Sequence, residues 1–136
     1  LREFSDRPIE ALSGGQRQRV WIAMALAQGT DILVLDEPTT YLDLAHQLDI
    51  LLLLQKLNKE EGRTIIMVLH DLNHASRFSH FMMAMRDGNL MVNGSPKEVM
   101  TKENLQRVFN IDAEMAVCPY SENPICLSYQ LYDMKK

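Results

Sequence analysis

Two short motifs in the first third of the chain combine residue types that could bind a phosphate group. The first is LSGGQ, in which Ser13 stands where a helix N-cap would stand. Gly14 and Gly15 follow it and expose backbone N–H groups without a Cβ in the way. The helix that they open points the positive end of its dipole outward, and this geometry binds an anion. A serine hydroxyl, neighbouring amides and a helix terminus together suit a terminal phosphate, with Gln16 as a further side-chain donor.

The second motif is the apolar run Ile32–Leu35, which ends in Asp36 and Glu37. Ligands of open α/β sheets collect beyond the carboxyl ends of the strands, so both carboxylates are expected at the site. One carboxylate can hold Mg²⁺ through water, while the other orients and deprotonates a water that attacks a γ-phosphorus. Because alternate strand residues point to opposite sides, we assign Asp36 to Mg²⁺ and Glu37 to the catalytic base.

Each motif is a weak indication when it stands alone. Many Ser-capped helices bind nothing, and an isolated Asp-Glu pair is more often a helix N-cap followed by a first-turn acid. Here LSGGQRQR precedes an apolar strand with Asp-Glu-Pro at its end by about twenty residues. The combination therefore favours phosphate chemistry over two unrelated helix caps.

Two further polar residues follow in the same order along the chain. His70 ends the next apolar run and is expected on the same rim as Glu37, where it could hydrogen-bond a γ-phosphate oxygen. The alternative for His70 is to cap the next helix, which Asp71 could do equally well. Asp43 is expected to cap the long helix, with a second possible role across an interface. We interpret the remaining histidines as surface or packing residues: His46, His74 and His80.

Strands and helices alternate in the first two thirds of the chain, which favours a parallel sheet with crossover helices. The expected elements are a helix over 14–27, a strand over 32–35, a helix over 44–59, a strand over 64–69 and a helix over 71–79. Helical spacing suggests one apolar face for each of the first two helices. These faces are Val20, Met24 and Ala27 in the first helix, and Leu44, Leu48, Leu51 and Leu52 in the second.

The last third contains signals for short elements. Asp87-Gly88 predicts a hairpin between 81–85 and 90–92, and a β meander is expected to begin there. Ser95-Pro96 predicts the start of a short helix, and a further helix is expected over 101–109. Two extended runs are expected from residue 113 onward, around 119–124.

Composition excludes some classes of function. The chain of 136 residues is 46% hydrophobic and 24% charged, which is typical of one globular domain. A net charge of −4 argues against nucleic acid as a main partner. Cys118 and Cys126 lie eight residues apart with no histidine nearby, so we interpret them as free thiols; a cross-strand disulfide is the alternative.

The order LSGGQ, ILVLDEP, TTYLD and VLHDLN resembles the nucleotide-binding domain of ATP-binding cassette (ABC) transporters. In that family these segments are the signature motif, Walker B with its catalytic glutamate, the D-loop and the switch histidine. The resemblance implies an α/β fold of the P-loop NTPase type, with ATP and Mg²⁺ as cofactors. It also implies a dimer with a second ABC ATPase subunit. ATP lies between Walker A of one subunit and the signature of the other, so Ser13–Gln16 would act in trans.

No G-x-x-x-x-G-K-[ST] loop occurs in the 136 residues. The family's Walker A loop, its adenine-stacking aromatic residue and its Q-loop glutamine have no counterpart here. We therefore expect residues 1–136 to be the C-terminal portion of a single ABC ATPase domain. The isolated chain is expected to hold ATP poorly, to lack ATPase activity and to self-associate through uncovered apolar faces.

The segments TTYLDLAHQLDIL and HDLNHASRFSH are similar to importers of iron chelates, including siderophores, haem and cobalamin. This resemblance implies an ATPase that drives uptake through membrane permease subunits and lies on the cytoplasmic face of the membrane. Two alternatives stay open: a non-transport ABC ATPase of the DNA-maintenance or translation type, and a catalytically silent piece that binds a partner cassette. The tail has neither heptads nor a basic arm, which favours transport.

Overall fold

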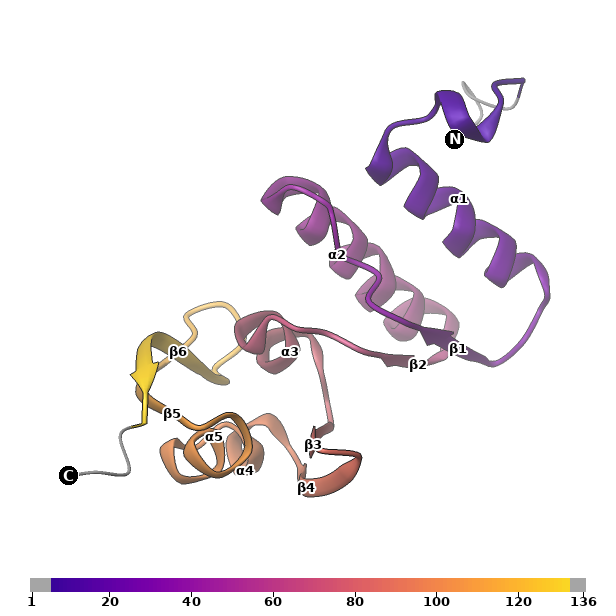
Figure 1. The fold of residues 1–136 in the computed structure, drawn as a ribbon. Helices are drawn as coiled ribbons and strands as arrows, with labels where there is room; N and C mark the ends of the chain where they lie inside the picture. Colours follow the sequence, from indigo (N-terminus) through magenta and orange to yellow (C-terminus); the bar gives the residue numbers. More distant parts are fainter. Residues whose placement is uncertain (1–5, 133–136) are drawn as a thin grey trace. The chain divides into compact units, whose positions relative to one another are not determined.

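The computed structural model describes residues 6–132, which form two compact units divided after Leu69 (Figure 1). The first unit contains a short 3-10 turn, two helices and two strands. Their order is η2 (Ile9–Ala11), α1 (Gly14–Ala27), β1 (Ile32–Leu35), α2 (Leu44–Glu61) and β2 (Thr64–Met67). All four predicted helices and strands of this unit are present, and the expected α/β fold class is confirmed. Only their ends differ: α2 is two residues longer and β2 two residues shorter than expected.

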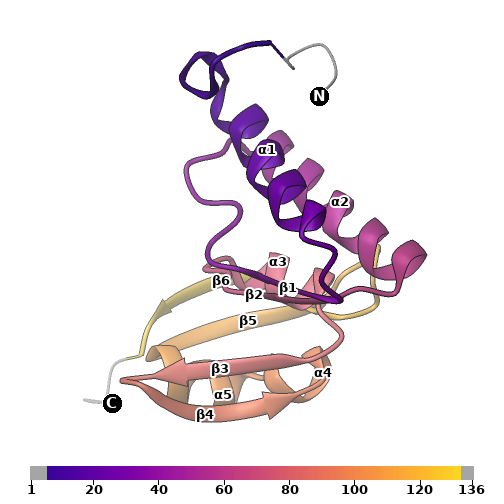
Figure 2. The same cartoon turned by 90° about the vertical axis from the view of Figure 1, so that its right-hand side faces the viewer.

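The two strands of the first unit form a parallel pair joined by the crossover helix α2. Ile32 lies opposite Thr64 and Leu35 lies opposite Met67. Figure 2 shows α1 and α2 side by side along one side of this pair. The core of the unit is the set of buried side chains between these layers, namely Ile22, Leu33, Ile50, Leu54 and Leu57. Gly62 ends α2 in the left-handed conformation with φ 68°, which favours glycine.

The buried faces of both helices differ from the predicted faces. In α1 the core residue is Ile22, whereas Met24 is 52% exposed. In α2 the buried residues are Ile50, Leu51, Leu54 and Leu57, whereas Leu44 and Leu52 are exposed. Both helices carry apolar residues on all sides, so helical spacing alone could not select the face that packs against β1.

The outer face of the β1–β2 pair is apolar and exposed. Ile32, Val34, Ile66 and Val68 are between 47% and 70% exposed. The opposite face carries Leu33, which is 4% exposed and packs in the core. Parallel strands are normally covered on both faces. Within the described residues of the first unit, helices cover this pair on the Leu33 face alone.

The second unit contains α3 (Leu72–Phe78), β3 (Met82–Arg86), β4 (Asn89–Gly94), α4 (Pro96–Val99), α5 (Lys102–Phe109), β5 (Ile111–Val117) and β6 (Pro124–Leu131). The turn between β3 and β4 has positive φ at both Asp87 (50°) and Gly88 (75°), as expected for an Asp-Gly hairpin. The expected β meander is wrong. In the described part of the chain β3–β4 and β5–β6 are two separate antiparallel pairs, because α4 and α5 stand between them in the sequence.

One side chain fastens α3 to the last hairpin. The side-chain amide of Asn73 donates to the carbonyl of Cys126 (3.0 Å) and accepts from its N–H (2.7 Å). It therefore satisfies both backbone groups of Cys126, as the backbone of an adjacent strand would. The hydroxyl of Ser76 also donates to the carbonyl of Pro124 at 2.6 Å. Cys118 and Cys126 are buried free thiols, as interpreted from the sequence. Burial raises the pKa of the Cys126 thiol.

Within residues 6–132, every helix is too short or too polar to cross a lipid bilayer.

Candidate functional site

The LSGGQ motif forms the turn that begins α1. The Ser13 side chain accepts from the backbone N–H of Gln16 (3.3 Å), and the Gln16 side-chain oxygen accepts from the N–H of Ser13 (3.0 Å). This reciprocal pair is a capping box, and it fixes the turn without any ligand. Arg17 then begins the helical pattern by donating its N–H to the Ser13 carbonyl at 2.8 Å.

The capping box determines which groups of the turn are free for an anion. It uses the N–H groups of Ser13 and Gln16, so the helix-end donors left among the described residues are those of Gly14 and Gly15. Ser13 and Gly14 are exposed, whereas Gly15 is buried. The Gln16 side-chain oxygen accepts within the turn, and the NH₂ group of this side chain is its only donor for a phosphate. The turn is therefore preformed and accessible at its outer end.

The two acids follow β1 directly and differ in their surroundings. Asp36 is exposed, and Glu37 is half-buried with φ 47°. A left-handed non-glycine residue costs about 1–3 kcal/mol, and it persists only where its surroundings hold it. Here Thr40 holds it twice: its N–H donates to the Glu37 carbonyl (3.2 Å), and its hydroxyl donates to the Glu37 carboxylate (2.9 Å). The backbone thus turns sharply at Glu37, and one carboxylate oxygen has a fixed position.

The donor set around Asp36 fits Mg²⁺ but not a closed metal cage. Within residues 6–132 no group of three histidine, cysteine or acidic side chains is placed to hold a metal ion. Magnesium is usually held by one or two carboxylates together with phosphate oxygens and water. A single exposed carboxylate such as Asp36 is therefore sufficient only when a nucleotide supplies the other ligands.

Asp43 caps α2, as predicted from the sequence. Its Oδ1 accepts from the backbone N–H of His46 at 2.9 Å, and both of its oxygens lie 2.8 Å from Nδ1 of the same residue. These hydrogen bonds, the backbone one first, lower the pKa of the Asp43 carboxyl below its usual value.

The lowered pKa gives a testable dependence of stability on pH. A carboxyl whose pKa is lower in the folded state stabilises the fold above its unfolded pKa of about 4, and this contribution disappears as the pH falls through the folded value. Asp43→Asn keeps an N-cap acceptor but cannot ionise. We expect the difference in urea midpoint between wild type and Asp43→Asn to shrink as the pH falls below about 4. The pKa of Glu98 is also lowered, chiefly by the Ser95 hydroxyl, but this cancels because both proteins contain it. A difference that does not change with pH would contradict the prediction.

His70 is exposed at the start of the second unit, two residues before α3. Asp71 caps α3 by accepting the N–H of His74 at 2.7 Å, so the alternative capping role is already filled. The contact of His70 with a γ-phosphate stays a prediction.

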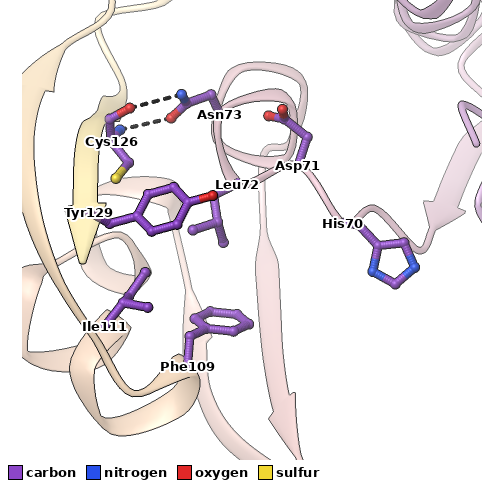
Figure 3. A pocket seen from close by; sticks show the side chains of 8 residues that line it. All are labelled: His70, Asp71, Leu72, Asn73, Phe109, Ile111, Cys126 and Tyr129. Carbon is purple, nitrogen blue, oxygen red and sulfur yellow. Dashed lines mark hydrogen bonds between the residues drawn. The ribbon is translucent and has the colours of Figure 1, made fainter. Parts of the chain in front are cut away.

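A pocket of about 330 Å³ lies beside His70 within the second unit (Figure 3). Its apolar part consists of Leu72, Phe109, Ile111 and Tyr129, and the imidazole of His70 points away from that cluster. The sequence did not predict this pocket, because its lining combines residues 70–73, the last residue of α5 and residues of both strands of the β5–β6 hairpin.

The sequence interpretation also missed two residues that support the candidate site. One is Thr40, three residues after Glu37, and the other is His46, three residues after Asp43. Each residue lies three positions after an acid, where its side chain can hydrogen-bond the carboxylate of that acid. This spacing is the signal that could have identified both residues.

Comparisons with known proteins agree with the motif order. The family described as ABC transporter matches residues 1–40. The iron(3+)-hydroxamate import ATP-binding protein FhuC of Bacillus subtilis is 63% identical over the whole chain, which covers 51% of that protein. The ferric enterobactin transport ATP-binding protein FepC of Escherichia coli is 46% identical over 92% of the chain, which covers 46% of it.

Solved structures agree on the fold. An inward-facing metal-chelate type ABC transporter has a TM-score of 0.81 at 30% identity, over 93% of this chain and 51% of that one. The post-hydrolysis dimer of the cassette MJ0796, bound to ADP and Pi, has a TM-score of 0.62 at 40% identity, over 70% of this chain and 40% of that one.

The chain therefore belongs to the ATP-binding domains of ABC transporters and has their P-loop NTPase fold. It spans about half the length of the curated relatives that it matches. Those relatives are named as ATP-binding proteins of iron-siderophore import, the subgroup that the sequence motifs resemble.

Proposed function

We propose that residues 1–136 are the C-terminal portion of the nucleotide-binding domain in an ABC importer for iron–siderophore complexes. The names of the relatives support this substrate class over haem or cobalamin. In this proposal the complete subunit pairs with a second ATPase subunit and with membrane permease subunits, on the cytoplasmic face of the membrane. The named relatives also favour transport over DNA maintenance or translation.

The reaction would use the two acids that follow β1 at the nucleotide. The Glu37 carboxylate accepts a proton from water as the water oxygen bonds to the γ-phosphorus and the bond from that phosphorus to the β-phosphate oxygen breaks. His70 donates a hydrogen bond to a γ-phosphate oxygen. Asp36 would hold Mg²⁺, which neutralises phosphate charge when bound. Ser13, Gly14 and Gly15 would bind the γ-phosphate of the nucleotide held by the partner subunit.

The observation that carries the proposal is the fixed position of Glu37. It stands beyond the carboxyl end of the parallel strand β1, half-buried, with one carboxylate oxygen accepting from the Thr40 hydroxyl at 2.9 Å. A surface acid that served only as a helix cap would have no need of a left-handed backbone. This arrangement suits a base that must keep its position while water reacts.

An ATP-binding experiment tests whether the chain binds ATP only together with a complete partner subunit. Labelled ATP with Mg²⁺ is titrated into the 136-residue chain alone, and into a mixture of the chain with intact Bacillus subtilis FhuC. We expect weak binding to the chain alone, and ATP-dependent association of the two proteins, followed by energy transfer between two dyes. Tight ATP binding by the chain alone would contradict the proposal, as would a mixture in which ATP promotes no association.

The exposed face of the β1–β2 pair predicts self-association of the isolated chain. Covering apolar surface is worth about 25 cal/mol per Å², so two chains gain by packing this face together. Val34 lies at the centre of this face and is 70% exposed, so it is the residue to change. Val34→Asp should lower the weight-average mass in sedimentation at micromolar concentration. Leu127→Asp is the matched control, because Leu127 is 65% exposed in the second unit. A wild-type chain that sediments as a monomer would refute the prediction.

A further inference from the structure

The LSGGQ turn contacts His46, a histidine for which the sequence predicted no role at the phosphate site. Gly15 is buried, and a Cβ added to it would lie 2.6 Å from Cδ2 and 3.1 Å from Cγ of His46. The same test on Gly14 finds Leu42 at 3.5 Å, an ordinary contact. Gly14 therefore faces the loop that leads into α2 and Gly15 faces the first turn of α2, and the imidazole ring of His46 would have to shift to admit a side chain at Gly15.

The orientation of this ring is fixed from its other side. Nδ1 of His46 lies 2.8 Å from both carboxylate oxygens of Asp43. An ionised carboxylate can only accept, so Nδ1 carries the proton. Asp43 is in turn held by the helix end, because its Oδ1 also accepts the backbone N–H of His46. The ring is thus clamped between the D-loop acid and the backbone of the signature turn, although it is 48% exposed.

A second contact lies one turn further along both helices. Arg19 follows Gly15 by four residues and Asp49 follows His46 by three, and their side chains meet at 2.7 Å. Below this ion pair lie Ile22 and Ile50, each 1% exposed. The two helices α1 and α2 therefore contact each other at three successive places. These are the buried core, the Arg19–Asp49 ion pair and, nearest the phosphate-binding turn, the ring of His46.

We propose that His46 is a positioning residue whose ring fixes the distance between the signature turn and the D-loop. The backbone N–H groups of Gly14 and Gly15 therefore move together with Asp43. The inference rests on the proposed function, because it assumes that this turn binds the γ-phosphate held by a partner subunit. It adds a physical link from that turn to the loop that also contains Thr40, the hydrogen-bond donor to Glu37. The ring supports the turn by contact, and Asp43 keeps the ring in place.

Stability measurements on the 136-residue chain test the contact without any nucleotide. Alanine is favoured over glycine inside a helix, but in the wild type the new methyl group at Gly15 meets the ring. We expect Gly15→Ala to lower the urea midpoint in the wild type and to raise it in the His46→Ala background. The same sign in both backgrounds would overturn the contact.

Association with intact FhuC tests the positioning role. We expect His46→Ala to weaken ATP-dependent association about tenfold, within the usual range for a coupling residue. His46→Phe keeps a ring but loses the Nδ1 contact with Asp43, so it should recover only part of the loss. His80→Ala, at an exposed histidine of the second unit, should match the wild type. Leu57→Ala, a core change far along α2, controls for lost stability and should associate normally under conditions where it is folded.

The outcomes separate this inference from the proposed function. If the wild type fails to associate, the proposed function fails, while the stability comparison still decides the contact. If the wild type associates and His46→Ala does so equally well, His46 has no positioning role. A loss of the same size in Leu57→Ala, or no recovery in His46→Phe, would also overturn the proposal.

Discussion

Replacing Glu37 with glutamine is expected to reduce ATP hydrolysis in a complete cassette by about 10²–10⁴-fold. The amide has the shape of the carboxylate but cannot accept a proton from the attacking water. The measurement needs a chain that also contains a phosphate loop. Joining the N-terminal half of the 63%-identical Bacillus subtilis relative to Leu1 would supply one. Steady-state phosphate release by this fusion gives the rate.

The contrast between binding and turnover makes this test specific. Glu37→Gln should still bind ATP and form ATP-dependent dimers, because the amide changes no contact of the signature turn. Thr40→Val, which removes the hydroxyl 2.9 Å from the carboxylate, should lower the rate less than Glu37→Gln does. Wild-type turnover in Glu37→Gln would refute the assignment of the base. An inactive wild-type fusion would instead favour a catalytically silent chain.

Gly14→Asp should weaken ATP-dependent association with intact FhuC by about 100-fold or more, because like charges brought together cost several kcal/mol. Gly14 is the exposed glycine of the turn, and its N–H is one of the two donors that the capping box leaves over. Aspartate in the first turn of a helix is favourable for folding, since it faces the positive end of the dipole. The loss should therefore arise from repulsion of phosphate and not from unfolding.

Gly14→Ala is the matched control for that variant. A Cβ at this position meets only Leu42 at 3.5 Å, so alanine fits without displacing a neighbour. Its association should stay within about threefold of the wild type, which is the effect of less than 1 kcal/mol. Equal association by Gly14→Asp and the wild type would show that no phosphate approaches this turn.

Local chemistry made the elements and caps of this chain predictable. Ser13, Asp43 and Asp71 each cap the helix that the sequence assigned to them, and each does so with a side-chain oxygen three residues ahead of the N–H that it accepts. The Asp87-Gly88 turn was equally predictable, because glycine, asparagine and aspartate adopt a positive φ more readily than other residues. Such features depend on neighbours in the sequence and need no knowledge of the tertiary fold.

Features that depend on distant neighbours could not be predicted. The apolar stripe of α1 was misplaced because Trp21 and Met24 are as apolar as Ile22, and only the position of α2 decides which of them is buried. His46 was interpreted only as a surface or packing residue for the same reason, since its partner Gly15 lies 31 residues earlier in the sequence. The roles of Glu37 and His70 at a nucleotide follow from motif order, and they stay predictions until measured.

The one-sided covering of the β1–β2 pair has a consequence for how such a domain can be assembled. The strands and their crossover helix lie within 36 consecutive residues, 32 to 67, so they can close on one another by local search. The uncovered side presents four exposed aliphatic side chains, three of them (Ile32, Val34 and Ile66) in the register of the strand pair. A layer that covers this exposed face can therefore join after the two strands and α2 have closed on one another.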